Sequence, residues 1–377
     1  NGGRRYGAQF VVDVFQAGAG TSHNMNVNEV LANIAIQSLG GEPGDRAIVD
    51  PNDHVNMGQS TNDVVPTAMR LTALKLLKPL QEALNLLSER LDEAAERFRN
   101  VRKSGRTHLQ DAVPIGLNRE FAAWALTIRK NIARLTAVVP ELQELGIGGN
   151  AVGTGINTPP GFAERICVAI ARETGLTVRP GSDLVELCQN TDVFVVLSAA
   201  LRTLALDLTR IANDLRLLAS GPTTGFGEIH LPEVQPGSSI MPGKVNPVMA
   251  EMLNMVCYQV IGCDAAIAMA CQAGQLELNV MMPLIAWNLN HTLTILASSS
   301  RLFAEKCVKG VSANEERCRY YLDHTLGAAT LLNPVIGYLA SARVAHRAQA
   351  EGRSIREVTI EEGILSAQDY DKLLAGS

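Results

Sequence analysis

The segment Pro236-Gly-Ser-Ser-Ile-Met-Pro-Gly-Lys-Val-Asn-Pro247 concentrates residues that could bind a small anion and act on it. Its two glycines and three prolines exclude a regular helix. Gly237 allows backbone N–H groups to converge, Lys244 supplies positive charge, and the Asn246 carboxamide can donate to a carboxylate. We therefore predict a binding loop, with an ordinary surface loop as the alternative. Its candidate polar residues are Ser238, Ser239, Lys244 and Asn246.

Two further tracts are rich in hydroxyl and carboxamide groups and directly precede apolar helical runs. In the first, residues 18–29, Asn26 or Asn28 could serve simply as the cap of the following helix. The second tract, residues 52–63, has the same character. A role in binding and a role in helix capping fit both tracts equally well. The second tract ends with Ser60, Thr61, Asn62 and Asp63.

A shorter polar tract, residues 104–114, includes Gly105-Arg-Thr-His-Leu-Gln-Asp111. It places Thr107 and His108 in a polar turn ahead of another expected helix. A single histidine is usually structural, but one beside a threonine in such a turn could contact a substrate or tune a proton. Both interpretations stay open at this point.

The sequence excludes several classes of function. None of the four tracts has the spacing of a metal site, a phosphate loop or a dinucleotide fingerprint, so we expect proton chemistry without a cofactor or metal. A net charge of −5 gives no general attraction to nucleic acid or anionic membranes, which leaves small molecules as expected partners. The seven cysteines form no CxxC pair, as is typical of reduced thiols in a cytoplasmic protein. The nearest approach to a membrane span, residues 193–208, is interrupted by Ser198, Arg202 and Asp207.

Long helices must position these tracts. The chain of 377 residues has 46% hydrophobic but only 4% aromatic residues, which favours helices packed through aliphatic side chains. Apolar residues recur at steps of three and four, the period of a helix with one buried face. Helices of this length are typical of a bundle, which neighbouring chains often extend. The spacing predicts five of them, over residues 66–98, 117–145, 184–218, 248–269 and 284–308.

The pattern also predicts a division into three domains. Residues 1–62 would be the remainder of an N-terminal domain, residues 63–311 the central long-helix bundle, and residues 312–377 a small C-terminal helical domain. Helices shorten after about Ser312, and glycines and prolines divide the tail. The chain starts at Asn1 without a methionine and soon enters the motif-rich tracts, so we expect that an upstream segment is missing.

The loop Gly237-Ser-Ser-Ile-Met-Pro-Gly-Lys-Val-Asn-Pro247 resembles the signature of the fumarase/aspartase superfamily. The other motifs of that superfamily appear in the same order along nearly the whole chain. They are Gly20-Thr-Ser-His-Asn-Met-Asn-Val-Asn-Glu29, Gln59-Ser-Thr-Asn-Asp63, Gly105-Arg-Thr-His-Leu-Gln-Asp111, Gly153-Thr-Gly-Ile-Asn157, Asn213-Asp-Leu-Arg-Leu217 and Glu277-Leu-Asn279.

The resemblance implies a mainly α-helical fold, a long-helix bundle that assembles as a homotetramer with each active site built from three subunits. It also implies elimination across the Cα–Cβ bond of a succinyl-type substrate, with release of fumarate. Ser238 resembles the base that removes the Cβ proton. The remaining site residues implied are donors to the β-carboxylate (Thr21, Ser60, Thr61 and Ser239), residues at the α-carboxylate (Thr107, Lys244 and Asn246), and residues near the amino group (Asn62 and His108, with Glu251 supporting His108). Ser22 is a further substrate-binding residue implied by the resemblance.

Within the superfamily, the sequence resembles the ammonia-lyases that convert L-aspartate to fumarate and ammonia. Gly18-Ala-Gly-Thr-Ser22 and Asn246-Pro-Val-Met249 match that branch rather than the fumarate hydratases. Against this, His108 is shared with the hydratases, and Met282 stands where many aspartases have glutamate. A fumarate hydratase is therefore the alternative function, and a non-catalytic structural member of the superfamily is a second one.

Overall fold

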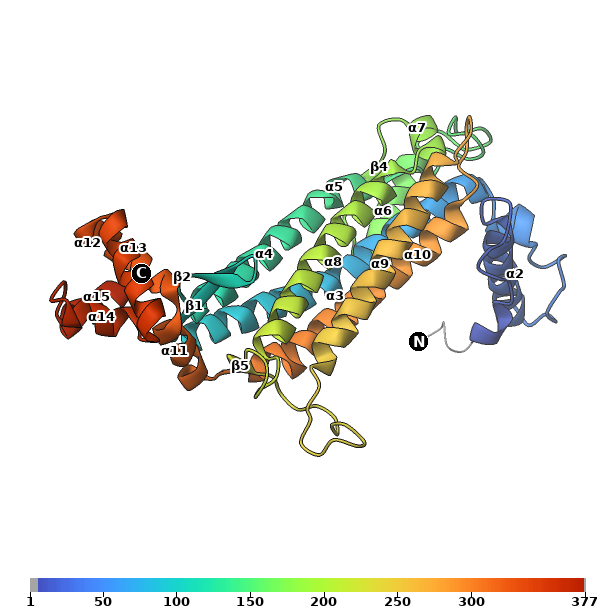
Figure 1. The fold of residues 1–377 in the computed structure, drawn as a ribbon. Helices are drawn as coiled ribbons and strands as arrows, with labels where there is room; N and C mark the ends of the chain where they lie inside the picture. The colour runs from blue at the N-terminus through green and yellow to red at the C-terminus, as the bar shows by residue number, and fades with distance from the viewer. Residues whose placement is uncertain (1–5, 376–377) are drawn as a thin grey trace. The chain divides into compact units, whose positions relative to one another are not determined.

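The computed structural model describes residues 6–375, so the start of the chain, on which the prediction of an upstream segment rests, lies outside the described residues. Within them helix dominates, which confirms the predicted mainly α-helical fold class (Figure 1). The helices of eight or more residues are α2 (Thr21–Ser38), α3 (Thr61–Arg97), α4 (Leu117–Ala137), α6 (Phe162–Thr174), α8 (Asp192–Leu218), α9 (Val248–Gln272), α10 (Met282–Lys306), α11 (Glu315–His324), α13 (Tyr338–Glu351) and α15 (Ala367–Ala375).

Shorter elements connect these helices. The short helices are α5 (Val139–Leu142), α7 (Leu184–Gln189), α12 (Asn333–Ile336) and α14 (Ile355–Glu361), with 3-10 turns η1 (Gly7–Gln9), η3 (Val308–Gly310) and η4 (Leu326–Leu332) and a π-turn η2 (Pro51–Val55). The strands are β1 (Arg102–Thr107), β2 (Gln110–Gly116), β3 (Glu144–Leu145), β4 (Arg179–Pro180), β5 (Ile229–His230) and β6 (Ser312–Ala313), and they form three two-stranded sheets.

Three of the five predicted long helices, α3, α9 and α10, form close to the predicted bounds. The other two were predicted too long. The helix predicted over 117–145 ends at Ala137, because Pro140 lacks the N–H that would continue its hydrogen bonding. The helix predicted over 184–218 is divided into α7 and α8, because the backbone of Asn190 is extended (φ −104°, ψ 134°).

The chain divides into two compact units, and each contains a part of all five long helices. Unit 1 comprises Asn1–Ala83, Lys130–Leu206 and Met255–Ser298, and unit 2 comprises Leu84–Arg129, Asp207–Asn254 and Ser299–Ser377. The three domains predicted from the sequence, with boundaries after residues 62 and 311, remain a prediction.

Aliphatic packing and buried carboxylates, among them Asp264, hold unit 1 together. Leu77 and Leu80 of α3 are 2% and 0% exposed, as the leucine spacing requires. Asp264 of α9 accepts hydrogen bonds from Ser198 Oγ at 2.7 Å and from Arg202 Nη1 at 2.8 Å, both on α8. These bonds fix α8 against α9 within this unit.

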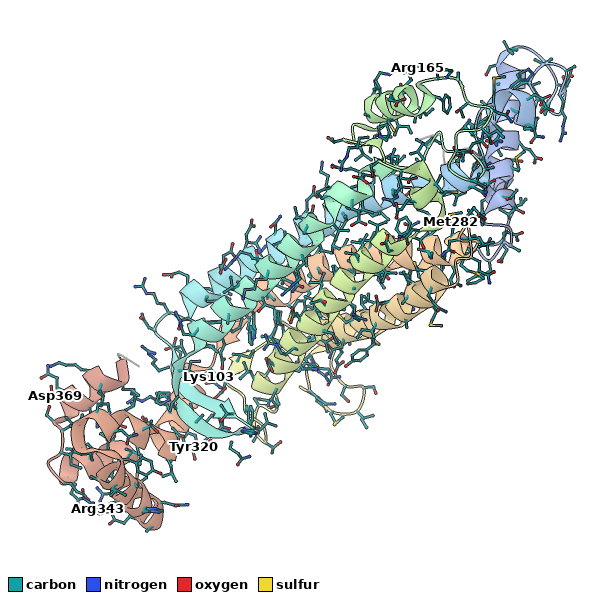
Figure 2. The ribbon with its side chains drawn as sticks, turned by 90° about the horizontal axis from the view of Figure 1, so that it is seen from above. Lys103, Arg165, Met282, Tyr320, Arg343 and Asp369 are labelled. Carbon is teal, nitrogen blue, oxygen red and sulfur yellow. The ribbon has the colours of Figure 1, made fainter. Side chains whose placement is uncertain are left out.

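Unit 2 carries the antiparallel hairpin β1–β2 and the C-terminal helices. Leu84, Leu87 and Leu91 continue the buried stripe of α3, and all three are fully buried. Strand β1 of the hairpin packs against α11. Figure 2 labels Lys103 of β1 and Tyr320 of α11 in this region. The C-terminal helices share a separate apolar cluster, which consists of Ala328, Ala329, Leu332, Val344, Ala348, Ile355, Val358 and Tyr370.

Among residues 6–375, α9 is the one helix that is long and apolar enough to cross a membrane, with a mean hydropathy of 1.4 over its most apolar stretch. The sequence-based choice of residues 193–208 as the nearest approach to a span was therefore wrong. Only 39% of that stretch of α9 is buried in the chain, so an apolar face of this helix is left uncovered by its own fold.

Candidate active site

The loop that joins β5 to α9 can be followed in Figure 1 and contains Ser238. The Ser238 hydroxyl lies at the start of a tight turn of this loop. Its Oγ accepts the backbone N–H of Met241 at 3.1 Å and that of Ile240 at 3.3 Å. Two N–H donors on one hydroxyl oxygen favour its deprotonated form. The alkoxide of such a serine forms more easily than that of a serine exposed to water. The side chain is only half-buried, so a small molecule can reach it.

The same turn is closed by Lys244. The Ser238 N–H donates to the Lys244 carbonyl at 3.2 Å, and the Lys244 N–H donates to the Met241 carbonyl at 3.2 Å. A Cβ atom on Gly237 would lie 1.9 Å from the Lys244 carbonyl oxygen, so this position tolerates no side chain. Gly237, which was predicted to let N–H groups converge, is thus required because the backbone of Lys244 approaches it closely.

A cavity of about 320 Å³ lies at the C-terminal end of this loop. The side chains of Lys244, Asn246, His230 and Glu233 contribute polar groups to its lining. A volume of this size suits a small dicarboxylate. A cavity of about 430 Å³ in unit 1 is lined mainly by aliphatic side chains around Val64, Val65 and Trp287 and does not suit a dianion.

Thr107 and His108 form the end of the β1–β2 hairpin. Thr107 pairs with Gln110, so His108 and Leu109 are the two turn residues. Both have positive φ, 55° and 60°, a conformation that such turns normally give to Asn or Gly. The polar turn predicted from the sequence is therefore a strained hairpin tip, and the exposed His108 and Thr107 project from it.

Glu251 lies in the first turn of α9, and its Oε1 is 3.8 Å from Arg216 Nη2 of α8. The support of His108 by Glu251, which the family resemblance implies, stays a prediction. The ion pair with Arg216 joins the start of α9 to the end of α8 within unit 2.

In unit 1, Thr21 and Ser22 open helix α2. Gly20 precedes them in a left-handed conformation (φ 89°), and the Thr21 hydroxyl donates to the Gly18 carbonyl at 2.6 Å. The suggestion that Asn26 or Asn28 caps this helix was wrong, because both lie inside it. The helix starts earlier than its apolar pattern indicates, since its first two turns carry polar residues.

Two of the polar residues in the first turns of α2 form a hydrogen-bonded cluster with Asn56, and the sequence did not predict this cluster. Asn24 and Asn28, each 7% exposed, both donate to Asn56 Oδ1, at 3.2 Å and 2.9 Å. Asn56 donates in turn to the Gln59 carbonyl at 3.2 Å. The step of four between Asn24 and Asn28 on a helix was the signal that could have paired them.

Ser60, Thr61 and Asn62 stand at the start of α3. The Ser60 hydroxyl accepts the Asn62 N–H at 3.2 Å, as a helix cap does, and Asn62 Nδ2 donates to the Ala151 carbonyl at 2.8 Å. The capping interpretation is thus confirmed for Ser60, and it does not exclude a role in binding. Thr61 is 8% exposed.

Asp63 anchors this helix start and was missed as a site-forming residue. Its buried carboxylate accepts the N–H groups of Ser60 at 2.9 Å, Gly148 at 3.0 Å and Asn150 at 2.9 Å. Burial raises the pKa of the Asp63 carboxyl, although the backbone hydrogen bonds lower it. Asp63 lies in the first turn of α3, and an acidic residue in the first turn of a helix is the sequence signal that could have revealed its anchoring role.

The structure therefore brings the predicted residues together in local groups. Ser238 contacts the backbone of Lys244, Thr107 adjoins His108, and Ser60 contacts Asn62. Unit 2 holds Thr107, His108, Ser238, Ser239, Lys244, Asn246 and Glu251, while unit 1 holds Thr21, Ser22, Ser60, Thr61 and Asn62. Within residues 6–375, no group of three or more His, Cys, Asp or Glu side chains is placed to hold a metal ion.

Comparison with known proteins places this chain in a class of lyases. The sequence model of a family described as "Lyase" matches residues 4–262, and that of "Fumarase C C-terminus" matches residues 329–375. The chain belongs to the fumarase/aspartase superfamily.

Similar curated proteins include aspartate ammonia-lyases. That of Bacillus subtilis is 45% identical over 97% of this chain and 77% of its own length. That of Escherichia coli is 43% identical over the same shares. Among solved structures, a fumarate lyase:delta crystallin from Brucella melitensis bound to cobalt is 49% identical with a TM-score of 0.94, over 97% of this chain and 80% of that one. A class II fumarase from Schistosoma mansoni is 40% identical with a TM-score of 0.92 over the same shares.

Proposed function

We propose that this protein is an aspartate ammonia-lyase, which converts L-aspartate reversibly to fumarate and ammonia. The observation that carries the proposal is the Ser238 hydroxyl, whose oxygen accepts two loop N–H groups and is thereby prepared to act as a base. The aspartate ammonia-lyases that are 43% to 46% identical across nearly the whole chain support the choice of substrate.

In the proposed reaction, the Ser238 alkoxide takes the proton from Cβ of aspartate. The electron pair moves into the β-carboxylate and forms an aci-carboxylate dianion, which donors from Thr21, Ser60, Thr61 and Ser239 stabilise. The pair then returns to form the Cα–Cβ double bond as the Cα–N bond breaks and ammonia leaves. Lys244, Asn246 and Thr107 would hold the α-carboxylate, and Asn62 and His108 would lie near the amino group.

A fumarate hydratase is the second candidate, because a class II fumarase shares the fold at 40% identity. The same base and carboxylate donors would serve malate, with water as the leaving group. The two functions differ only in the group at Cα, so residues near that group, His108 and Asn62, decide between them.

A homotetramer is part of the proposal. Its support is the apolar face of α9 that the chain itself leaves exposed, with Met255 at 65%, Tyr258 at 56% and Met269 at 62% exposure. An apolar helix face of this kind is typical of an interface between copies. Such an assembly would bring donors of neighbouring subunits to one site.

We also propose a cytoplasmic location. None of the seven cysteines, all of which lie within residues 6–375, forms a disulfide. Burial raises the pKa of Cys307 and of Cys318 to about 12, so these thiols stay protonated and unreactive at neutral pH. Small proteins exported to oxidising compartments use their cysteines differently, as disulfides.

The direct test is substrate turnover by the purified protein. We expect ammonia release and fumarate absorbance from L-aspartate, and little fumarate from L-malate under the same conditions. Fumarate from L-malate without ammonia from L-aspartate would instead identify the hydratase. Turnover of neither substrate would contradict both functions.

Lys244→Ala tests the proposed grip on the α-carboxylate. Loss of a charged donor to a carboxylate is worth about 1.5–3 kcal/mol, so we expect KM for L-aspartate to rise about 10- to 100-fold, with a smaller change in kcat. The control is Lys372→Ala, an exposed lysine on α15 that pairs with Asp369. An unchanged KM in Lys244→Ala would contradict the role of Lys244 in binding.

A further inference from the structure

We infer that Glu228 is a positioning residue for the proposed reaction: its buried carboxylate ties the hairpin that carries Thr107 and His108 to the stem of the loop that carries Ser238. The inference rests on the proposed function and adds a residue that lies outside the family motifs described above. All residues involved belong to unit 2.

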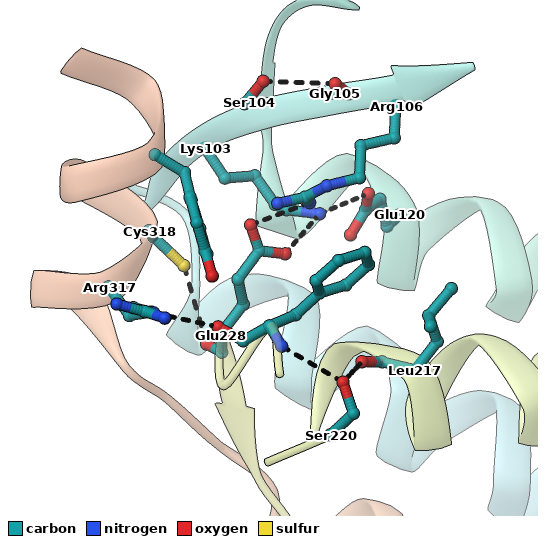
Figure 3. A network of polar contacts seen from close by, with 12 residues as sticks. Lys103, Ser104, Gly105, Arg106, Glu120, Leu217, Ser220, Glu228, Arg317 and Cys318 are labelled. Atoms are coloured by element: carbon teal, nitrogen blue, oxygen red, sulfur yellow. Dashed lines mark hydrogen bonds and ion pairs between the residues drawn. The ribbon is translucent and has the colours of Figure 1, made fainter. Parts of the chain in front are cut away.

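Glu228 is fully buried and forms ion pairs with two cations of strand β1 (Figure 3). Lys103 Nζ lies 2.9 Å from Glu228 Oε2, and Arg106 Nη1 lies 2.9 Å from Glu228 Oε1. Lys103 also contacts Glu120 Oε1 at 3.0 Å. The two positive and two negative charges balance, which buried charges require.

The hairpin is irregular between the two cations that meet at this one carboxylate. Side chains alternate between the faces of a regular strand, so positions 103 and 106 would point in opposite directions. The pairing register of β1 with β2 shifts between Ser104 and Arg106, where β2 contributes one residue more than β1, and such a bulge increases the local twist of the hairpin. Gly105 makes the shift possible, because a Cβ there would lie 2.7 Å from the Val113 carbonyl oxygen.

The guanidinium of Arg106 is fixed from other directions as well. It lies over the ring of Phe226 at 4.2 Å and over that of Tyr321 at 5.1 Å. Arg106 is 11% exposed at its side chain and directly precedes Thr107 in the sequence. Its position therefore fixes where the hairpin tip starts.

The backbone of Glu228 is held equally firmly at the base of the Ser238 loop. Its N–H donates to the Leu218 carbonyl at 2.9 Å, and its own carbonyl accepts the Asn314 N–H at 2.9 Å. Strand β5 follows immediately and pairs with β6. Ser238 lies ten residues further along the chain. One side chain thus joins the supports of both catalytic segments.

The test compares Glu228→Gln and Glu228→Asp with the wild-type protein. Glu228→Gln removes the charge, and Glu228→Asp keeps it but withdraws the carboxylate by one methylene, so the second variant preserves the charge balance if the first fails to fold. Glu228 does not itself hold substrate. The hairpin also carries Thr107, a proposed contact to the α-carboxylate, so we expect KM for L-aspartate to rise, but by less than kcat falls. We expect kcat to fall about 30- to 100-fold, since a misplacement of about 1 Å costs about 100-fold in rate.

Asp264→Asn and Asp264→Glu are the matched controls. Asp264 is a carboxylate 6% exposed that also bridges two partners, Ser198 and Arg202, but in unit 1. We expect these variants to lose thermal stability while folded protein keeps its kcat within about threefold. Equal losses of kcat in the Glu228 and Asp264 variants, per folded molecule, would overturn the inference.

Amide hydrogen exchange gives a readout that does not depend on the substrate. Residues 102–116 and 231–247 should both exchange faster in Glu228→Asp, and neither should change in Asp264→Glu. Faster exchange in only one of the two segments, or in neither, would overturn the inference. If the wild-type protein does not release ammonia from L-aspartate, the proposed function fails, but the exchange result still decides whether Glu228 couples the two segments.

Discussion

Replacing Ser238 by alanine is expected to lower kcat for L-aspartate by about 1,000-fold or more. The variant loses the atom that we propose removes the Cβ proton, and the N–H groups of Ile240 and Met241 lose their acceptor, Ser238 Oγ. Effects of this size are typical of removing a group that takes part in the chemical step itself. Steady-state kinetics, with the oligomeric state measured by light scattering, checks the prediction.

Ser239→Ala is the comparison, because it removes the same atom from the adjacent position of the same loop. Ser239 is a proposed donor to the β-carboxylate and not the base. Its loss should raise the free energy of the transition state by roughly 2–4 kcal/mol, a smaller effect than the loss of the base. The assembly of both variants should be unchanged. Retention of wild-type kcat in Ser238→Ala would exclude this serine as the base.

Gly237→Ala is expected to lower kcat about 100-fold with little change in the thermal unfolding midpoint. The added Cβ would meet the Lys244 carbonyl oxygen at 1.9 Å, and a backbone atom cannot yield as a flexible side chain does. The Ser238 N–H to Lys244 carbonyl bond must then open, which displaces the hydroxyl from its donors. The loop lies outside the apolar core, so stability is spared.

Gly7→Ala is the matched control for this change. A Cβ at Gly7 meets nothing within 4 Å, and its φ is not in the left-handed region, so the same substitution causes no clash there. Kinetics and thermal unfolding of both variants separate loop closure from a general effect of glycine replacement. Full activity in Gly237→Ala would show that the closed turn is not needed for catalysis.

The sequence predicted the helical architecture well where one face of a helix is continuously apolar. The leucines of α3 are spaced as a buried stripe, and Leu80, Leu84 and Leu87 are indeed fully buried. Periodicity cannot show where such a helix is interrupted without a change in its pattern. The break at Asn190 leaves the spacing of leucines on either side intact, so α7 and α8 were predicted as one helix.

The candidate site was predictable to the level of loops and residue types, but not of geometry. The glycine, serines and lysine of residues 237–244 indicated an anion-binding loop, whereas the bonds from the N–H groups of Ile240 and Met241 to Ser238 depend on the folded turn. Glu228 and Asp63 were missed because each acts through partners more than 80 residues away or through backbone groups. Local sequence patterns do not reveal such long-range contacts.

The backbone conformation at the tip of the β1–β2 hairpin depends on the rest of the protein, so the hairpin would not keep it in isolation. His108 and Leu109 both occupy a conformation that costs an ordinary residue about 1–3 kcal/mol. Cut out as a peptide, or transplanted into an unrelated hairpin, residues 102–116 would relax into a wider loop, and the imidazole would lose its direction. The orientation of the His108 side chain therefore depends on the entire folded chain and not on the motif of residues 105–111 alone.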